Sequence, residues 1–108
     1  MAITKFNLNQ ISQEIHTPWA PTDIETVNNA VIRIAQFNGQ YHWHKHDHQD
    51  ELFLVFKGKI TLQTKDGDIV LNENEGVKIP QGLEHCPSSI EPSIVLMFEP
   101  LQLISEGD

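Results

Sequence analysis

The sequence predicts a small all-β barrel, and three observations lead to that prediction. β-branched and aromatic residues gather in short runs, which glycine, proline, asparagine and aspartate separate at close intervals. Histidines occupy every second position from His42 to His48, and alternation is the period of a strand. The chain has 108 residues and 39% hydrophobic residues, which is enough for one domain with a core of its own.

The first thirty residues are expected to form an arm that packs on the barrel, and residues 31–108 to form the barrel itself. Ile11 and Ile15 lie four residues apart, which indicates one short helical turn. The prolines in Pro18–Pro21 then end any helix. The arm is therefore predicted to be mostly irregular.

The first predicted strand is the β-branched run Val31–Phe37. Asn38-Gly39 follows it, and this dipeptide favours a hairpin turn because both of its positions tolerate positive φ. Tyr41–His46 would then return beside the first strand. Glu51–Lys57 is almost continuously apolar, as expected of a strand that is covered on both faces.

A second hairpin is expected at Asp66-Gly67, between strands at 59–65 and 68–71. A two-residue loop there pairs Thr64 with Ile69 and Leu62 with Leu71. Four apolar residues then share one face of the hairpin: Ile60, Leu62, Ile69 and Leu71. The remaining predicted strands are Val77–Ile79, a segment around His85, and Ser93–Glu99.

The charge of the chain limits its partners and its compartment. Fifteen acidic residues against seven basic ones give a formal net charge of −8, which opposes phosphate backbones and anionic lipids. We therefore expect no nucleic-acid partner and no membrane partner. The first ten residues do not resemble a signal peptide, and the single cysteine, Cys86, cannot form an intrachain disulfide. These features predict a cytoplasmic protein.

The alternating histidines indicate a metal site. On one extended segment, His42, His44 and His46 project from the same face. Glu51 follows shortly after, and His85 lies far along the chain. Imidazoles and a carboxylate are ligand types that first-row transition metals prefer. The predicted site therefore lies inside the barrel.

Arg33 is a candidate for binding a ligand beside this metal. If Asn38-Gly39 forms a hairpin, the alternating histidines lie on the face that carries Ala35 and Arg33. An inward Arg33 would suit a small anionic ligand, such as a carboxylate or a phosphate. If the turn contains a bulge instead, the face is reversed and Arg33 points to solvent. Both alternatives remain open at the level of sequence.

The spacing of these residues resembles the first cupin motif. That motif has a glycine, an H-x-H pair, a glutamate and a second glycine, and five residues here match it in order: Gly39, His44, His46, Glu51 and Gly58. The gap before the first histidine is one residue shorter than is usual. The second cupin motif is matched by Pro80, Gly82 and His85, with Asn74 at its first glycine and Ser89 at its final asparagine. The resemblance spans roughly residues 31–99.

Similarity to cupins implies a double-stranded β-helix, or jelly-roll barrel, that binds one divalent transition metal per chain. The ligands that it implies are His44, His46, Glu51 and His85, and the metal would be Fe, Mn, Ni, Co or Zn. An octahedral metal held by four such ligands keeps two adjacent positions open. Zinc could instead be closed by four ligands and be purely structural. His42 is then a residue of the substrate pocket or a surface residue, and His48 is expected to be solvated.

Three functions are compatible with such a site. The first is a metal-dependent oxygenase or isomerase acting on a small molecule. The second is a non-catalytic module that binds or senses a small molecule, and the third is a structural metalloprotein. A homodimer is also expected, because apolar residues on both faces of Glu51–Lys57 need a cover from the N-terminal segment or from a second chain.

Overall fold

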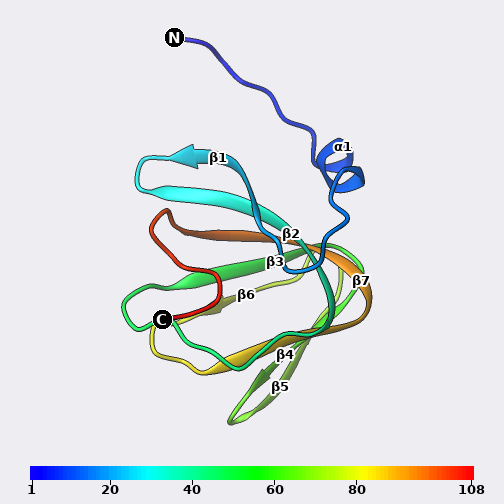
Figure 1. The fold of residues 1–108 in the computed structure, drawn as a ribbon, viewed down its shortest axis with the longest axis vertical. Helices are drawn as coiled ribbons and strands as arrows, with labels where there is room; N and C mark the ends of the chain where they lie inside the picture. The colour runs from blue at the N-terminus through cyan, green and yellow to red at the C-terminus, as the bar shows by residue number, and fades with distance from the viewer.

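The computed structural model describes residues 1–108 and contains one helix and seven strands. The elements are α1 (Leu8–Gln13), β1 (Thr22–Val27), β2 (Ala30–Gln40), β3 (Glu51–Lys57), β4 (Ile60–Thr64), β5 (Gly67–Leu71), β6 (Gly76–Ile79) and β7 (His85–Pro100). The strands curl into a small antiparallel barrel (Figure 1), which confirms the predicted fold class. The helix is far too short to span a bilayer, and no other helix is present.

The longest strand, β7, holds the barrel together. Its first residues pair with β4, and its remainder pairs with β2 on one side and β3 on the other. The strand order is therefore β1-β2-β7-β3-β6, with the β4-β5 hairpin attached through β4 (Figure 1). The sequence predicted two separate strands within this span, but the structure joins them into one bent strand of 16 residues.

The inner face of the sheet carries the main core. Alternate residues of the three central strands point inward, as the period of two requires. Ten buried residues form this cluster: Ala35, Phe37, Phe53, Val55, Ile60, Leu62, Leu71, Ile79, Val95 and Met97. Glu51 and His85 are buried at the first residues of β3 and β7, so the core continues directly into a polar region.

Part of the outer face is covered by the N-terminal segment. Leu8, Ile11 and Ile15 pack against buried Ile34 and Leu96 of the sheet. The side chain of the residue that precedes α1, an asparagine, caps the helix by accepting a hydrogen bond from a backbone amide. The helical turn predicted at Ile11 is therefore present, and it shields this part of the outer face from water.

The hairpin predicted at Asn38-Gly39 is wrong. β2 continues through both residues and pairs with β7 on either side of Asn38, with Gly39 opposite Ser89. Gly39 has a φ of 80° and lies at a β-bulge that shifts the register after Phe37. A residue with positive φ occurs in a β-bulge as well as in a hairpin turn. The Asn38-Gly39 dipeptide therefore marks a bulge here and not the predicted turn. The segment that returns, Tyr41–His46, is a loop with a single bridge residue at His44.

The second hairpin is present, but its pairing is shifted by two residues. Thr64 pairs with Gly67 and Leu62 pairs with Ile69, so the loop is Lys65-Asp66. A shift of two residues keeps every side chain on its predicted face. Three of the four predicted apolar residues are buried, whereas Ile69 is 42% exposed near the projecting tip of the hairpin (Figure 1).

Candidate metal centre

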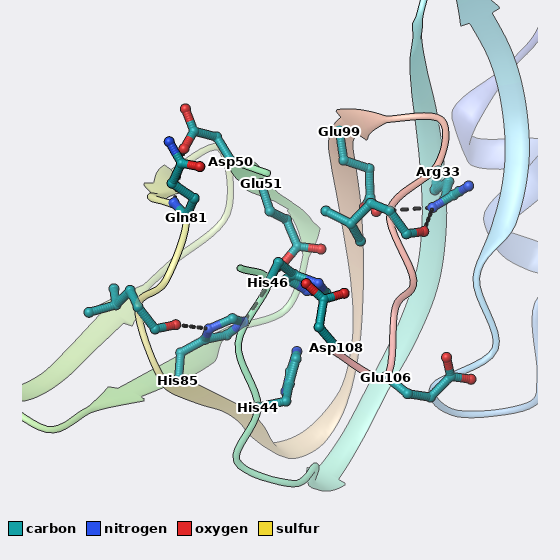
Figure 2. A network of polar contacts seen from close by, with 12 residues as sticks. Arg33, His44, His46, Asp50, Glu51, Gln81, His85, Glu99, Glu106 and Asp108 are labelled. Atoms are coloured by element: carbon teal, nitrogen blue, oxygen red, sulfur yellow. Dashed lines mark hydrogen bonds and ion pairs between the residues drawn. The ribbon is translucent and has the colours of Figure 1, made fainter. Parts of the chain in front are cut away.

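Three histidines converge inside one end of the barrel. His44, His46 and His85 each place a ring nitrogen so that these atoms lie within 4.8 Å of one another. Oε1 of Glu51 lies 3.6 Å from Nε2 of His46 and 3.7 Å from Nε2 of His85 (Figure 2). The structure therefore brings together all four residues that the cupin resemblance implied as ligands.

Different elements position these side chains. Glu51 and His85 are the first residues of β3 and β7, and both are buried. His44 and His46 belong to the loop before β3, where a bridge of two backbone hydrogen bonds joins His44 to His85. The carbonyl of His46 also accepts a hydrogen bond from the amide of Gly82 at 2.8 Å. The loop is thus fixed by its backbone, although it is not a strand.

Backbone carbonyls select the tautomers of two histidines. Nδ1 of His44 lies 3.0 Å from the carbonyl oxygen of His42, and Nδ1 of His85 lies 2.9 Å from that of Leu83. A carbonyl only accepts, so each Nδ1 carries the proton and donates it. The lone pair of each ring is then on Nε2, where it is available to a metal.

Several polar atoms of this cluster are buried without a hydrogen-bond partner. They are Nδ1 and Nε2 of His46, Oε1 of Glu51 and Nε2 of His85. A buried polar atom without a partner costs free energy, and such atoms are rare in folded proteins. A cation bound among them would satisfy the lone pairs that now face one another. The donor set therefore fits a transition metal.

The protonation states of the cluster also suit a metal. Burial, assisted by the neighbouring rings of His85 and His46, lowers the pKa of His44 to about 4. Burial alone would raise the pKa of Glu51, but His46 and His85 outweigh it and lower the pKa to about 2. At neutral pH His44 is neutral and Glu51 is ionised, which are the forms that coordinate.

Arg33 is not brought to the histidines. Its side chain points toward the barrel interior and is only 12% exposed. The sequence predicted this orientation only with a hairpin, but a bulge is present and lies beyond Arg33 in β2, so it does not turn Arg33 to solvent. Its Nε bonds to Asp23 at 2.8 Å. Its Nη1 bonds to Glu99 at 3.0 Å (Figure 2). The carbonyls of Leu101 and Leu103 accept from Nη2 and Nη1. These contacts use every nitrogen of the guanidinium, so Arg33 anchors the segment that follows β7.

Glu99 is a buried carboxyl that the sequence reasoning missed. Its side chain is fully buried beside the guanidinium of Arg33. Burial and the nearby carboxylate of Glu51 raise the pKa of Glu99 to about 8, although Arg33 opposes this shift. The sequence could have indicated its burial, because Glu99 alternates with Val95 and Met97 and so lies on the inward face of β7.

The other histidines and the cysteine lie outside the cluster. The ring of His42 is exposed, packs on Tyr41 with centroids 4.0 Å apart, and has Nε2 2.8 Å from the carbonyl oxygen of Glu106. His48 is exposed, and Cys86 is fully buried. Neither of these two residues contributes to the group of ring nitrogens.

An aromatic cavity adjoins the histidines. Its volume is about 30 Å³, room for roughly two water molecules. Trp19 forms part of its wall between Phe37 and Tyr41, with ring centroids 4.5 and 4.6 Å away. The indole is fixed because its Nε1 donates to the carbonyl of Asn38 at 2.9 Å. The other lining residues are Pro21, Ala35, His44, Glu51, Phe53, Pro87, Met97 and Ser105.

A segment that we call the C-terminal strap, residues 101–108, runs past the histidines (Figure 2), and its Ser105 lines the cavity. The amide of Asp108 donates to the carbonyl of Lys45 at 3.0 Å, and the amide of Asp47 donates to the Asp108 side chain at 2.6 Å. Gly107 passes so close to His44 that a Cβ on it would lie 2.7 Å from the Cβ of His44. The strap therefore packs directly on one of the candidate ligands.

Comparisons with known proteins agree with this geometry. The family model described as Cupin domain (Cupin_2) matches residues 33–99. YdbB of Bacillus subtilis (strain 168) is 36% identical over 94 residues, which cover 86% of this chain and 83% of YdbB.

Solved structures show the same fold. A cupin-2 domain containing protein from Shewanella frigidimarina NCIMB 400 aligns with a TM-score of 0.86 and 29% identity, covering 88% of this chain and 93% of that one. Protein NMB1881 from Neisseria meningitidis aligns with a TM-score of 0.82 and 23% identity, covering 90% and 99%. From its two motifs, its fold and these matches, the chain belongs to the cupin family.

Proposed function

We propose that this protein is a metal-dependent enzyme, an oxygenase or an isomerase, that acts on a small molecule at one divalent transition metal per chain. The metal is Fe, Mn, Ni, Co or Zn, held by His44, His46, Glu51 and His85. The observation that supports this most strongly is the set of buried, unpaired donor atoms at His46, Glu51 and His85. When bound, such a metal supplies a Lewis acid with exchangeable positions.

The protein's own residues prepare the site. The backbone carbonyls that accept from Nδ1 of His44 and Nδ1 of His85 orient both rings so that Nε2 is free to bind the metal. Glu51 provides one negative charge. Burial, together with the charges of Glu106 and Glu51, raises the pKa of Tyr41, so this phenol keeps its proton at the cavity wall. Tyr41 can therefore donate a hydrogen bond to a ligand. Trp19 and Phe37 continue the same aromatic wall and exclude water from it.

The cavity also indicates the kind of ligand. Its walls are mostly apolar and aromatic, and Arg33 is already paired with Asp23, Glu99 and strap carbonyls. An anionic group, which the sequence predicted as the ligand of Arg33, would have to meet its counter-charge at the metal. We infer a compact ligand with an apolar body and one or two oxygen donors.

The alternative is a cupin that binds or senses the same ligand without converting it. The cavity of about 30 Å³ does not favour either function, because the same ligand needs the same room whether or not it is converted. Both functions need an open coordination position on the metal, whereas a purely structural metal site needs none.

Nitric oxide distinguishes open from closed coordination. Tag-free protein loaded anaerobically with Fe(II) and exposed to nitric oxide should give the electron paramagnetic resonance signal of an iron–nitrosyl centre. Candidate small acids, ketones and phenols should then alter this signal by binding beside it. A protein shown to contain iron but lacking the signal would favour the structural metalloprotein. A signal with altered line shape but no turnover of any ligand would favour the binding module.

A further inference from the structure

The end of the C-terminal strap is held much more lightly than its beginning. The carbonyls of Leu101 and Leu103 accept from Arg33, and the side chain of Leu103 is buried. After Leu103 no side chain of the strap is buried, and Ile104 is 57% exposed. A segment without buried apolar side chains opens locally at little cost while the rest of the fold stays closed. We call residues 104–108 the lid.

Hydrogen bonds to one loop hold the lid in place. Nε2 of His42 lies 2.8 Å from the carbonyl oxygen of Glu106. The amide of Asp108 donates to the carbonyl of Lys45 at 3.0 Å, and the Asp108 carboxylate accepts from the amide of Asp47 at 2.6 Å. All of these residues are exposed, so water competes for the same hydrogen bonds. Figure 2 shows Glu106 and Asp108 beside the loop, which carries two of the candidate metal ligands.

The lid bounds the cavity beside the candidate metal centre. Ser105 lines this cavity, and a Cβ on Gly107 would lie 2.7 Å from the Cβ of His44. With the lid in this position the cavity has about 30 Å³, room for roughly two water molecules. A ligand with an apolar body needs more room. Most of the remaining wall belongs to strands of the barrel, and Trp19 is fixed by its hydrogen bond, so the lid is the part of the wall that can move.

Ser105 brings a polar group of the lid to the cavity. It is the one lid residue among those that line the space. The other polar side chains of the wall include Tyr41 and two candidate metal ligands, His44 and Glu51. With those two ligands on the metal, Tyr41 and Ser105 remain to bind the ligand itself. A serine hydroxyl both donates and accepts, so Ser105 suits a carbonyl, hydroxyl or carboxylate oxygen.

We propose that the lid opens to admit the ligand of the metal centre, closes over it, and places the Ser105 hydroxyl against an oxygen atom of that ligand. The proposal rests on the proposed function, because the ligand concerned is the one that binds at the metal. It adds the route by which this ligand enters and a residue that holds it. Closure of such a segment excludes water from a site and retains the bound molecule.

Two probes of different size test the opening. Nitric oxide fits the cavity with the lid in place, whereas 4-nitrocatechol, a ring with two oxygen donors, is far larger than the space. The protein is loaded anaerobically with Fe(II), and association of each probe is followed by stopped-flow absorbance. Asp108→Ala removes one hydrogen bond of the lid. It should speed association of 4-nitrocatechol about fivefold, because the loss of one exposed hydrogen bond shifts an equilibrium by that factor.

Two comparisons show whether this effect belongs to the lid. Asp108→Ala should leave the association rate of nitric oxide unchanged, since this probe needs no opening. Asp68→Ala is the matched control, at an exposed aspartate of β5, and should change neither rate. A protein that binds nitric oxide but not 4-nitrocatechol would overturn the proposal. So would an Asp108→Ala variant in which 4-nitrocatechol associates at the native rate.

Variants of Ser105 test the closed state. Ser105→Ala should raise the dissociation rate of 4-nitrocatechol about fivefold, because a hydrogen bond to the bound probe is lost. Metal content and the binding of nitric oxide should not change. Ser105→Thr keeps the hydroxyl and should restore the slower dissociation. A native dissociation rate in the Ser105→Ala variant would overturn the assignment of Ser105 as a binding residue.

Hydrogen exchange of the metal-free protein tests the lid without any metal. The amides of Gly107 and Asp108 donate to the carbonyls of Ile104 and Lys45. They should exchange by local opening, at rates that low concentrations of urea do not alter, whereas amides between β2 and β7 should exchange faster as urea is added. Lid amides that exchange only together with those of β2 and β7 would overturn the opening. A protein shown to contain iron but unable to bind nitric oxide would refute the proposed function, and this separate readout would still decide whether the lid opens.

Discussion

The backbones of His44 and His85 bond to each other twice. The amide of His44 donates to the carbonyl of His85 at 3.0 Å, and the amide of His85 donates to the carbonyl of His44 at 2.9 Å. Their rings lie with centroids 4.3 Å apart. Two candidate ligands from distant parts of the sequence are thus held at a fixed spacing by the main chain, which no side-chain substitution removes.

Because of this bridge, replacing a ligand should remove metal without unfolding the barrel. His85→Ala and Glu51→Ala should each lower metal affinity by more than about 100-fold, since a ligand and its charge or lone pair are lost. Metal content after dialysis, measured by mass spectrometry, checks this. His48→Ala is the matched control, because that ring is exposed and distant from the cluster, and it should retain full occupancy. Full occupancy in the His85→Ala variant would exclude the proposed ligand set.

The contribution of His44 to the stability of the metal-free protein should be lost as the pH falls below about 6.5, whereas the raised pKa of Glu99 acts in the opposite direction over the same range. Burial, with the rings of His85 and His46, lowers the pKa of His44 to about 4 in the folded chain, against 6.5 for an unperturbed histidine. The unfolded chain therefore binds more protons between these values, and the stability present above pH 6.5 is lost toward pH 4. The loss attributable to His44 between pH 7 and pH 5 should be about 1 kcal/mol, reduced by the partial exposure of the ring.

Urea unfolding at several pH values measures this loss. Between pH 7 and pH 5, His44→Gln should lose about 1 kcal/mol less stability than the native protein. His48→Gln should keep the profile of the native protein. A His44→Gln variant with the profile of the native protein would show that the ring is not held neutral by burial.

A side chain at Gly107 should displace His44. Gly107 has a φ of 100°, and a Cβ there would lie 2.7 Å from the Cβ of His44. Gly107→Ala should therefore weaken metal binding by about tenfold or more, because the candidate ligand or the strap has to move. Gly67→Ala is the control, since Gly67 also has a positive φ, of 126°, but has no atom within 4 Å. Isothermal titration of metal into both variants makes the comparison. Equal affinities would show that the strap does not constrain His44.

The sequence predicted the candidate ligands better than the path of the chain between them. Motif spacing depends on which residues must meet, so His44, His46, Glu51 and His85 were identified without a correct strand. The hairpin error at Asn38-Gly39 arose because positive φ at Gly39 is compatible with a turn and with a bulge. Only the pairing of β2 with the long strand β7 distinguishes a bulge from a turn at this position. The residues that pair are about fifty or more positions apart, so the sequence around Gly39 carries no pattern that predicts the pairing.

The residues of the cavity wall could not be predicted from the sequence for the same reason. Trp19 lies in a stretch that the prolines marked as irregular, and nothing in its own neighbourhood indicates that it reaches Tyr41. The strap was not predicted either, because its contacts with Arg33, Lys45 and His44 are all long-range. Asn74, by contrast, replaces a motif glycine and has a φ of 69°, as its residue type suggests.

The central position of β7 has a kinetic consequence. β2 and β3 have no pairing with each other, and each reaches the sheet through β7. His85 is the first residue of that strand, whereas Glu51 is the first residue of β3 and the other two candidate ligands precede β3. The four donors therefore cannot assemble before β7 docks, which is a late, long-range step. A saturating metal should consequently slow unfolding of the barrel in proportion to its affinity and leave the folding rate unchanged.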